Sequence, residues 1–158
     1  MAGSIERVTQ AAADAGLAIA VRRMGESTRT AEEAAAQCGC DIAQIVKSLV
    51  FQGQRSGRLY LFLLSGPNRL DLGKAGTLAG EPLKRAEPRH VRDVTGFAIG
   101  GVAPIGHLID IQAFADETLL AFDRVFAAAG AHDAVFEVET RPLLKAAKAR
   151  IAGLSVDA

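Results

Sequence analysis

Apolar positions recur with two different periods along the chain, which separates the expected helices from the expected strands. Helical spacing predicts helices over residues 4–16, 30–39, 71–80, 88–96 and 140–147. Runs rich in β-branched and other apolar residues predict strands over residues 17–22, 45–51, 59–64, 108–111, 124–127 and 134–138. No linker or repeat divides this pattern. We therefore predict one compact α/β domain over residues 1–158, with a mixed, mostly antiparallel sheet and flanking helices.

Polar residues mark the beginnings of several of these helices. Ser4, Thr30, Asp71 and Thr140 each precede an apolar helical pattern, and each can accept a hydrogen bond from an unpaired amide of the first turn. Thr30 is followed three residues later by Glu33, the spacing of a capping box. We expect these four residues to be N-caps.

Lys47 lies inside an otherwise apolar strand, residues 45–51. Strand alternation places it on one face with Ile45 and Leu49, whereas Ser48 lies on the opposite face. A buried cation is costly unless it faces an edge or a cleft. Two interpretations stay open from this segment alone. Lys47 either protects an edge strand from aggregation, or it holds a positive charge against an anionic or carbonyl oxygen of a ligand.

A glycine-rich segment, residues 96–106, is too apolar for a solvated linker and too rich in glycine for regular structure. Glycines such as Gly100, Gly101 and Gly106 let a ligand approach the backbone, and Pro104 stiffens the loop. Such a loop can present amides to an oxyanion or a phosphate. It can equally be a crossover between strands, and it matches neither a P-loop nor a dinucleotide-binding fingerprint.

Two further polar segments are candidates for ligand contact. The first comprises residues 27–30, where Arg29 could meet a phosphate. The second, residues 65–74, follows the apolar strand 59–64, and open α/β sheets commonly bind ligands at strand ends. Neither segment is specific by itself, because an exposed arginine and a polar loop are common on any protein surface.

Composition excludes several classes of function. The longest apolar runs are too short to cross a bilayer and the N-terminus lacks a signal-peptide pattern, so we expect a cytoplasmic protein that does not bind membranes. Cys38 and Cys40 are one residue apart, and the three histidines are scattered. We therefore predict no metal site and no cofactor. A net charge of zero argues against strong non-specific binding of nucleic acid.

Four segments, taken in order, resemble the YbaK/ProX family of editing domains associated with prolyl-tRNA synthetase. They are residues 27–34 (STRTAEEA), 45–51 (IVKSLVF), 68–75 (NRLDLGKA) and 95–107 (TGFAIGGVAPIGH). The resemblance covers nearly the whole chain. It implies a YbaK-like mixed-sheet fold and hydrolysis of aminoacyl-tRNA esters that carry the wrong amino acid. The stretch 127–133 departs from the pattern of some bacterial members, which leaves the substrate open.

The resemblance also implies roles for individual residues. The lysine that is essential in relatives maps to Lys47, and the loop that binds around the aminoacyl carbonyl maps to the segment between Gly100 and Pro104. We predict Lys47, Gly100 and Gly101 as catalytic residues. The predicted substrate-binding residues are Thr28, Arg29, Ser48, Ser65, Asp71, Lys74, Pro104, Gly106 and His107.

The reaction expected from this resemblance needs no protein nucleophile. An aminoacyl ester is already activated, so an enzyme has chiefly to position a water and stabilise the developing oxyanion. Editing is needed because one methylene of difference allows a synthetic site only about 10–200-fold discrimination. The expected partner is the acceptor end of aminoacyl-tRNA, with tRNAPro carrying Ala, Cys, Ser or Thr as the expected substrate. Involvement of prolyl-tRNA synthetase or an elongation factor stays open.

Two alternatives remain at this point. The chain could hydrolyse a different ester, or esters on several tRNAs. It could also be a non-catalytic tRNA-binding module associated with a synthetase. The presence of both Lys47 and the complete Gly/Pro loop favours an enzyme, because a binding relic could have lost either one.

Overall fold

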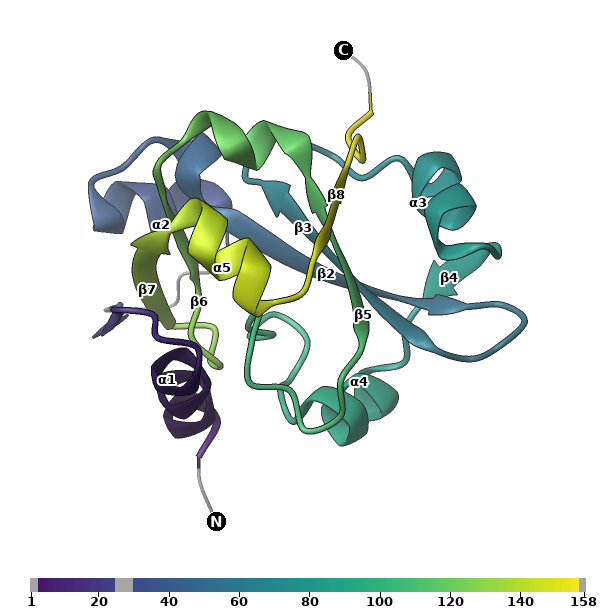
Figure 1. The fold of residues 1–158 in the computed structure, drawn as a ribbon, viewed down its shortest axis with the longest axis horizontal. Coiled ribbons are helices and arrows are strands. Elements are labelled where there is room, and N and C mark those ends of the chain that lie inside the picture. The colour runs from purple at the N-terminus through teal and green to yellow at the C-terminus, as the bar shows by residue number, and fades with distance from the viewer. Residues whose placement is uncertain (1–2, 25–29, 157–158) are drawn as a thin grey trace.

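The computed structural model describes residues 3–24 and 30–156, which form two β-sheets with helices around them (Figure 1). The larger sheet has five strands in the order β4-β2-β3-β5-β8, and the smaller sheet has three in the order β1-β7-β6. The strands are β1 (Ala20–Arg23), β2 (Val46–Gly53), β3 (Leu59–Ser65), β4 (Leu83–Arg85), β5 (Gln112–Asp116), β6 (Arg124–Ala128), β7 (Ala134–Glu139) and β8 (Arg150–Ala152). Antiparallel and parallel pairing coexist, so the predicted mixed, mostly antiparallel α/β fold is confirmed.

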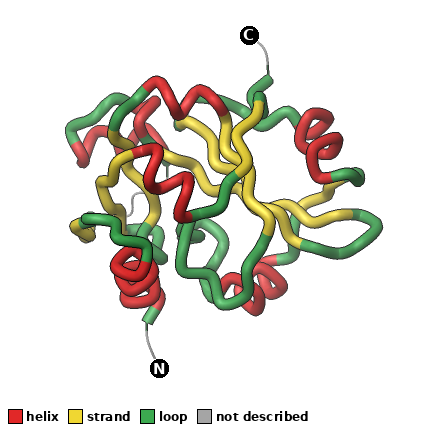
Figure 2. The backbone as a smooth tube through the Cα atoms, in the orientation of Figure 1, coloured by secondary structure: helices red, strands yellow, loops and turns green. Residues whose placement is uncertain are grey.

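Five α-helices and two short 3-10 segments connect the described strands. The helices are α1 (Ser4–Asp14), α2 (Ala31–Cys38), α3 (Leu72–Ala79), α4 (Pro88–Thr95) and α5 (Thr140–Ala146), and the 3-10 segments are Ile42–Gln44 and Glu117–Ala121. Figure 2 shows the strands running through the middle of the molecule, with the helices distributed around them. In the described part of the chain, no helix is both long enough and apolar enough to cross a membrane.

The strand β3 is buried on both faces, as its continuous apolar sequence predicts. Leu61 and Leu63 pack into the main core between the two sheets, together with residues of β6, β7, α4 and α1. Phe62 and Leu64 point to the other face, where Phe62 stacks on Phe114 at 5.4 Å between ring centroids. The larger sheet is therefore covered on both sides, and β2 beside it carries Lys47.

The predicted helix ends are mostly confirmed. Thr30 accepts a hydrogen bond from the Glu33 amide at 3.1 Å, and Asp71 accepts one from the Lys74 amide at 3.1 Å. Two predicted N-caps are wrong. Gly3 caps α1, so Ser4 is already helical, and Glu139 occupies the cap position of α5. The hydroxyl of Thr140 instead donates to the carbonyl oxygen of Phe122 at 2.7 Å, which ties α5 to the loop before β6.

Several predicted strands differ from the structure. The strand expected over residues 108–111 is wrong: this stretch is a loop whose Leu108 and Ile109 amides donate to carbonyl oxygens at the end of α4. The strand follows it as β5. The strand expected over residues 17–22 begins only at Ala20. The short strands β4 and β8 were not predicted, because three residues carry too little periodicity to be recognised.

The glycine-rich segment lies between α1 and α4 (Figure 1). The Arg7 side chain donates to the carbonyl oxygen of Gly96 at 2.5 Å and lies over the Phe97 ring, 4.9 Å from its centroid. Gly106 adopts a φ of +85° and packs so closely on the Arg7 backbone that a Cβ atom would lie 3.1 Å from its carbonyl oxygen. Helix α1 therefore packs against this loop and holds it through Arg7.

Candidate functional site

A cavity of about 250 Å³ lies where β2 of the larger sheet faces the smaller sheet. It is smaller than the ~300–1,000 Å³ of pockets for drug-sized ligands, so it suits a small group such as an amino-acid side chain. Its lining is mostly apolar. The lining residues come from the start of α2, from β2, from the glycine-rich loop, and from β6, β7 and the turn between them: Thr30, Ala31, Ala34, Ile45, Val46, Lys47, Ser48, Leu49, Gly100, Val102, Phe126, Ala127, Ala128, Ala131, His132, Ala134 and Val135.

Lys47 lines this cavity from β2. Residues 46–50 of β2 pair with β3 on one side only, because β4 begins to pair at Phe51. The ammonium group of Lys47 donates to the carbonyl oxygen of Asn68. Burial lowers the pKa of Lys47, the carboxylate of Glu32 opposes this effect, and Arg69 adds to it. The lysine is therefore a half-buried cation held by a backbone carbonyl, and no ion pair with a carboxylate is formed among the described residues.

Ser48 also lines the cavity, and its hydroxyl oxygen is buried without a hydrogen-bond partner among the described residues. A buried hydroxyl that makes no hydrogen bond costs about 1–3 kcal/mol. Its neighbours in the strand alternation, Val46 and Val50, pack in the main core, as the period-2 pattern predicts. Ser48 is therefore a polar group in a largely apolar lining that a ligand or a water can satisfy.

The glycine-rich loop reaches the cavity through its first half. Gly100 adopts a φ of +94°, and no atom lies within 4 Å of the position its Cβ would take. In the part of the chain that the structure describes, the amides of Gly100 and Val102 have no hydrogen-bond acceptor. Both residues line the cavity. They present the kind of free amides that can stabilise an oxyanion.

Gly101, the third predicted catalytic residue, lies outside the cavity lining. Its amide donates to the carbonyl oxygen of Ala98 at 2.9 Å. A Cβ atom at this position would lie 3.1 Å from the Cα of Ala131. Glycine is thus required here for close packing of the loop against the turn between β6 and β7, rather than for a free amide.

The second half of the loop turns away from the cavity. Pro104, Gly106 and His107 line a separate hollow beside α1. The Nε2 atom of His107 lies 2.7 Å from the carbonyl oxygen of Ala103, and its ring makes an edge contact with Phe97. Burial lowers the pKa of His107. These three predicted substrate-binding residues therefore do not share the cavity of Lys47 and Gly100, and their contacts are those of a loop framework.

The polar segment after β3 also lies outside the cavity lining. The Ser65 hydroxyl donates to the carbonyl oxygen of Ala43 at 2.5 Å. Asp71 caps α3, and the ammonium group of Lys74 donates to the carbonyl oxygen of Ser155 at 3.1 Å. These contacts fold the loop that supplies the Asn68 carbonyl. Two other predicted substrate contacts, Thr28 and Arg29, lie outside the described residues.

His132 was not among the predicted site residues, because the three histidines are far apart in the sequence. It is exposed in the turn between β6 and β7 and lines the cavity opposite β2. The sequence signal was a histidine two residues after Gly130, in the stretch that ends a buried strand. Among the described residues, no three His, Cys, Asp or Glu side chains are grouped to hold a metal ion.

Comparison with known proteins identifies related chains over most of this length. Uncharacterized protein YwhH of Bacillus subtilis is 32% identical over 117 residues, which cover 74% of each chain. Proline–tRNA ligase of Bacillus licheniformis is 31% identical over 136 residues. That match spans 83% of this chain and only 23% of the ligase, so this chain corresponds to one part of the larger enzyme.

Solved structures agree with these relatives. A crystal structure described as that of a candidate trans-editing enzyme for prolyl-tRNA synthetase is 47% identical, covers 99% of both chains and has a TM-score of 0.90. The family model for the aminoacyl-tRNA editing domain matches residues 25–146, which include Lys47, Gly100 and His132. The chain therefore belongs to the aminoacyl-tRNA editing domain family, the YbaK-type editing domains related to prolyl-tRNA synthetase.

Proposed function

We propose that this chain is a trans-acting deacylase that hydrolyses the ester of mischarged tRNA, with tRNAPro carrying Ala, Cys, Ser or Thr as its substrate. The observation that carries the proposal is that Lys47, Gly100 and Val102 line one small, mostly apolar cavity, and that the amides of Gly100 and Val102 have no acceptor among the described residues. A cavity of about 250 Å³ has room for a small aminoacyl group. The membership of the editing domain family gives the chemical class of the substrate.

The proposed reaction begins with the aminoacyl group in the cavity and the acceptor end of the tRNA at its mouth. A water adds to the ester carbonyl carbon, and the amides of Gly100 and Val102 stabilise the negative charge that develops on the carbonyl oxygen. The bond to the ribose oxygen then breaks. The proton released by the water passes to that oxygen, so the products are a free amino acid and an intact tRNA. The substrate's own ribose hydroxyl helps to orient the water.

Lys47 is proposed to hold the substrate by its positive charge. A cation that is half buried acts through a lower dielectric than water, so its attraction for a carbonyl or ribose oxygen is stronger than at an exposed site. The Asn68 carbonyl fixes the position of the ammonium group. Binding and orientation of this kind raise the rate by placing the ester next to the loop amides.

A deacylation panel tests the proposal. The chain is incubated with tRNAPro charged in turn with Ala, Cys, Ser, Thr and Pro, and the loss of each ester is compared with its loss in buffer. We expect rapid hydrolysis of at least one small non-cognate ester and survival of the prolyl ester. If every ester survives while the chain still binds the tRNA, the chain is a non-catalytic binding module and the proposal is wrong.

A further inference from the structure

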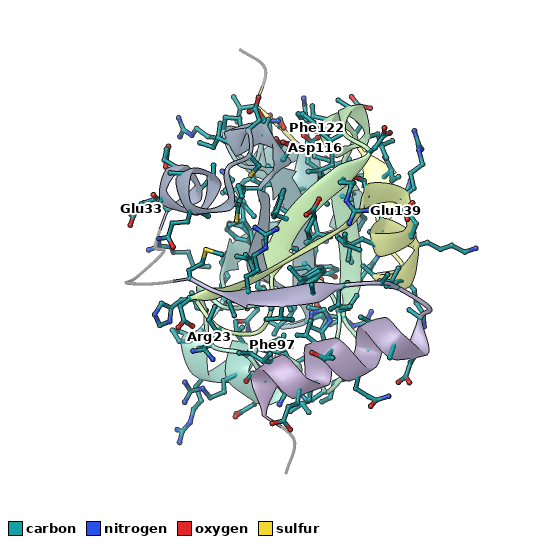
Figure 3. The ribbon with its side chains drawn as sticks, turned by 90° about the vertical axis from the view of Figure 1, so that its left-hand side faces the viewer. Arg23, Glu33, Phe97, Asp116, Phe122 and Glu139 are labelled. Carbon is teal, nitrogen blue, oxygen red and sulfur yellow. The ribbon has the colours of Figure 1, made fainter. Side chains whose placement is uncertain are left out.

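A buried carboxylate lies close to the loop that holds Lys47. Asp116 ends β5 and is 0% exposed. Figure 3 shows it in the upper part of the molecule, well above Phe97. Its Oδ1 atom accepts from the Leu154 amide at 2.8 Å. Its Oδ2 atom accepts from the hydroxyls of Ser155 and Thr118 at 2.5 and 2.6 Å, and from the Asn68 side-chain amide at 3.4 Å.

These contacts keep Asp116 ionised without a cation. Burial by itself would raise the pKa of Asp116, but the hydrogen bonds from Ser155, Thr118, Leu154 and Asn68 outweigh burial and hold it below its ordinary value. A buried charge without such partners would be strongly destabilising. The carboxylate therefore acts as an acceptor that gathers three segments of the chain at one point: the loop after β3, the start of the 3-10 segment after β5, and the C-terminal segment after β8.

Asn68 connects this acceptor to Lys47. Its side-chain amide donates to Asp116 and also to the Thr118 hydroxyl at 3.0 Å, while its backbone carbonyl accepts from the Lys47 ammonium group. Its own backbone amide donates to the carbonyl oxygen of Ser65 at 2.9 Å. The side-chain and backbone amides hold Asn68 from the Asp116 side and from Ser65, so they fix the Cα atom from which its carbonyl points toward Lys47.

The rest of the loop is fastened to the same C-terminal segment. The Asp71 amide donates to the carbonyl oxygen of Leu154 at 2.7 Å, and the Val156 amide donates to that of Arg69 at 2.8 Å. Leu70 and Ser155 form an isolated antiparallel bridge. The loop on either side of the Asn68 carbonyl is thus held by backbone contacts, and the Asn68 side chain adds the contact that orients this one peptide.

We propose that Asp116 and Asn68 are positioning residues for Lys47, because they fix the carbonyl oxygen that holds its ammonium group at the cavity. This inference rests on the proposed function of Lys47. Neither residue lines the cavity, so their effect on catalysis passes through the lysine. In this proposal the Asn68 side chain sets the direction of the Asn68 backbone carbonyl. A substitution at this position removes the side chain but leaves the carbonyl in the chain, so the two contributions can be tested separately.

The variant Asn68→Ala keeps the carbonyl and removes its anchor. With alanine-charged tRNAPro we expect kcat to fall about 10- to 100-fold, the size of effect that follows from a misplaced group, with KM little changed. The matched control is Ser155→Ala, which removes a hydrogen bond from the same Asp116 oxygen without touching Asn68. We expect a similar loss of thermal stability and a kcat within twofold of wild type.

A second readout does not depend on activity. The chain has five lysines, and the pKa of Lys47 can be followed through its Cε resonance by NMR, assigned with Lys47→Ala. A carbonyl acceptor favours the ammonium form, so the pKa of Lys47 falls further in Asn68→Ala and stays unchanged in Ser155→Ala. If Asn68→Ala does not fold, Thr118→Val can replace it, because it removes one partner of the Asn68 side-chain amide. We then expect kcat and the pKa of Lys47 to fall as well, each by less than in Asn68→Ala.

The proposal requires both changes. A folded Asn68→Ala variant with either an unchanged kcat or an unchanged pKa of Lys47 would overturn it. Lys47→Ala measured in the same assay distinguishes the two proposals. If Lys47→Ala is inactive while Asn68→Ala resembles wild type, the positioning role alone is wrong; if Lys47→Ala is fully active, the proposed function of Lys47 has failed.

Discussion

Two carboxylates, Glu81 and Asp116, are buried in this domain with similar chemistry and different consequences. Glu81 accepts hydrogen bonds from the Arg55 and Ser56 amides, from the Ser56 hydroxyl and from the Tyr60 hydroxyl. Asp116 likewise accepts four hydrogen bonds, from Leu154, Ser155, Thr118 and Asn68. Each is an acceptor that fixes a loop, and neither takes a hydrogen bond from a cationic side chain among the described residues.

The difference lies in where the fixed loop leads. Glu81 holds the turn between β2 and β3, which projects away from β6 and β7 (Figure 1), and neither Glu81 nor that turn lines the Lys47 cavity. Asp116 holds Asn68, whose carbonyl accepts from Lys47. A well-satisfied buried carboxylate therefore does not by itself indicate a functional site. The segment that it orders decides whether its loss affects stability alone or catalysis as well.

Removing a hydroxyl at the Glu81 cluster should give the largest effect on stability. Tyr60→Phe deletes the hydrogen bond of 2.7 Å to Glu81 in a residue that is almost fully buried. Hydrogen bonds to charged groups contribute about 1.5–3 kcal/mol, so we expect the free energy of unfolding to fall by that order in urea titrations. Turnover per folded molecule should stay at the wild-type value. A fall in kcat like that expected for Asn68→Ala would erase the distinction between the two clusters.

The second largest effect on stability is expected from acid, which should weaken the hydrogen bonds to Glu81. Hydrogen bonds from the Ser56 side chain and amide and from Tyr60 lower the pKa of Glu81 from 4.5 to about 2. Because the folded pKa lies below the ordinary value, its stabilising contribution is complete above pH 4.5 and is lost as the pH falls toward 2. The Tm of wild type should therefore fall over this range. In Glu81→Gln the fall should be shallower, with Asp116 and Asp133 supplying the remainder.

Parallel Tm curves for wild type and Glu81→Gln between pH 4.5 and 2 would contradict this assignment of the acid-sensitive contact. The neutral glutamine keeps the side-chain length and can still accept hydrogen bonds. Any difference in slope therefore reports the lost ionisation rather than the lost volume.

The smallest effect is expected from the cysteines and from chelation. Burial raises the pKa of Cys40 to about 11, with the Cys38 thiol adding to the shift, so the thiol stays protonated at neutral pH. Neither cysteine lines the cavity. The Cys38→Ala, Cys40→Ala double variant should hydrolyse mischarged tRNA within twofold of wild type, and EDTA should leave the rate unchanged. Activity lost on chelation and restored by zinc would require a metal-assisted mechanism instead.

The residues of the candidate site were predictable to the extent that each one broke a local pattern. Lys47 is a cation in an apolar strand, and Gly100 lies in a segment that suits neither a linker nor a regular element. The structure brings both to one cavity. The capping residues Thr30 and Asp71 could also be predicted from the sequence, because an N-cap depends on contacts within four residues.

The remainder depends on contacts between segments far apart in the sequence. Asp116 and Asn68 are 48 residues apart, and no local pattern distinguishes this aspartate from a solvated one. His132 joins the cavity only because β6 and β7 lie against β2. Conversely, His107 follows Gly100 closely in sequence yet faces α1, since Gly106 turns the chain onto the Arg7 backbone. Proximity in sequence was misleading where a loop changes direction.

The most direct test of the central claim is single-turnover hydrolysis of alanine-charged tRNAPro by wild type, Lys47→Ala and the exposed-lysine control Lys84→Ala. We expect Lys84→Ala to match wild type. Lys47→Ala should lose at least about 100-fold in rate, comparable to the loss of one group that stabilises a transition state, while its Tm stays close to that of wild type. A folded Lys47→Ala variant that hydrolyses the ester at the wild-type rate would contradict the account.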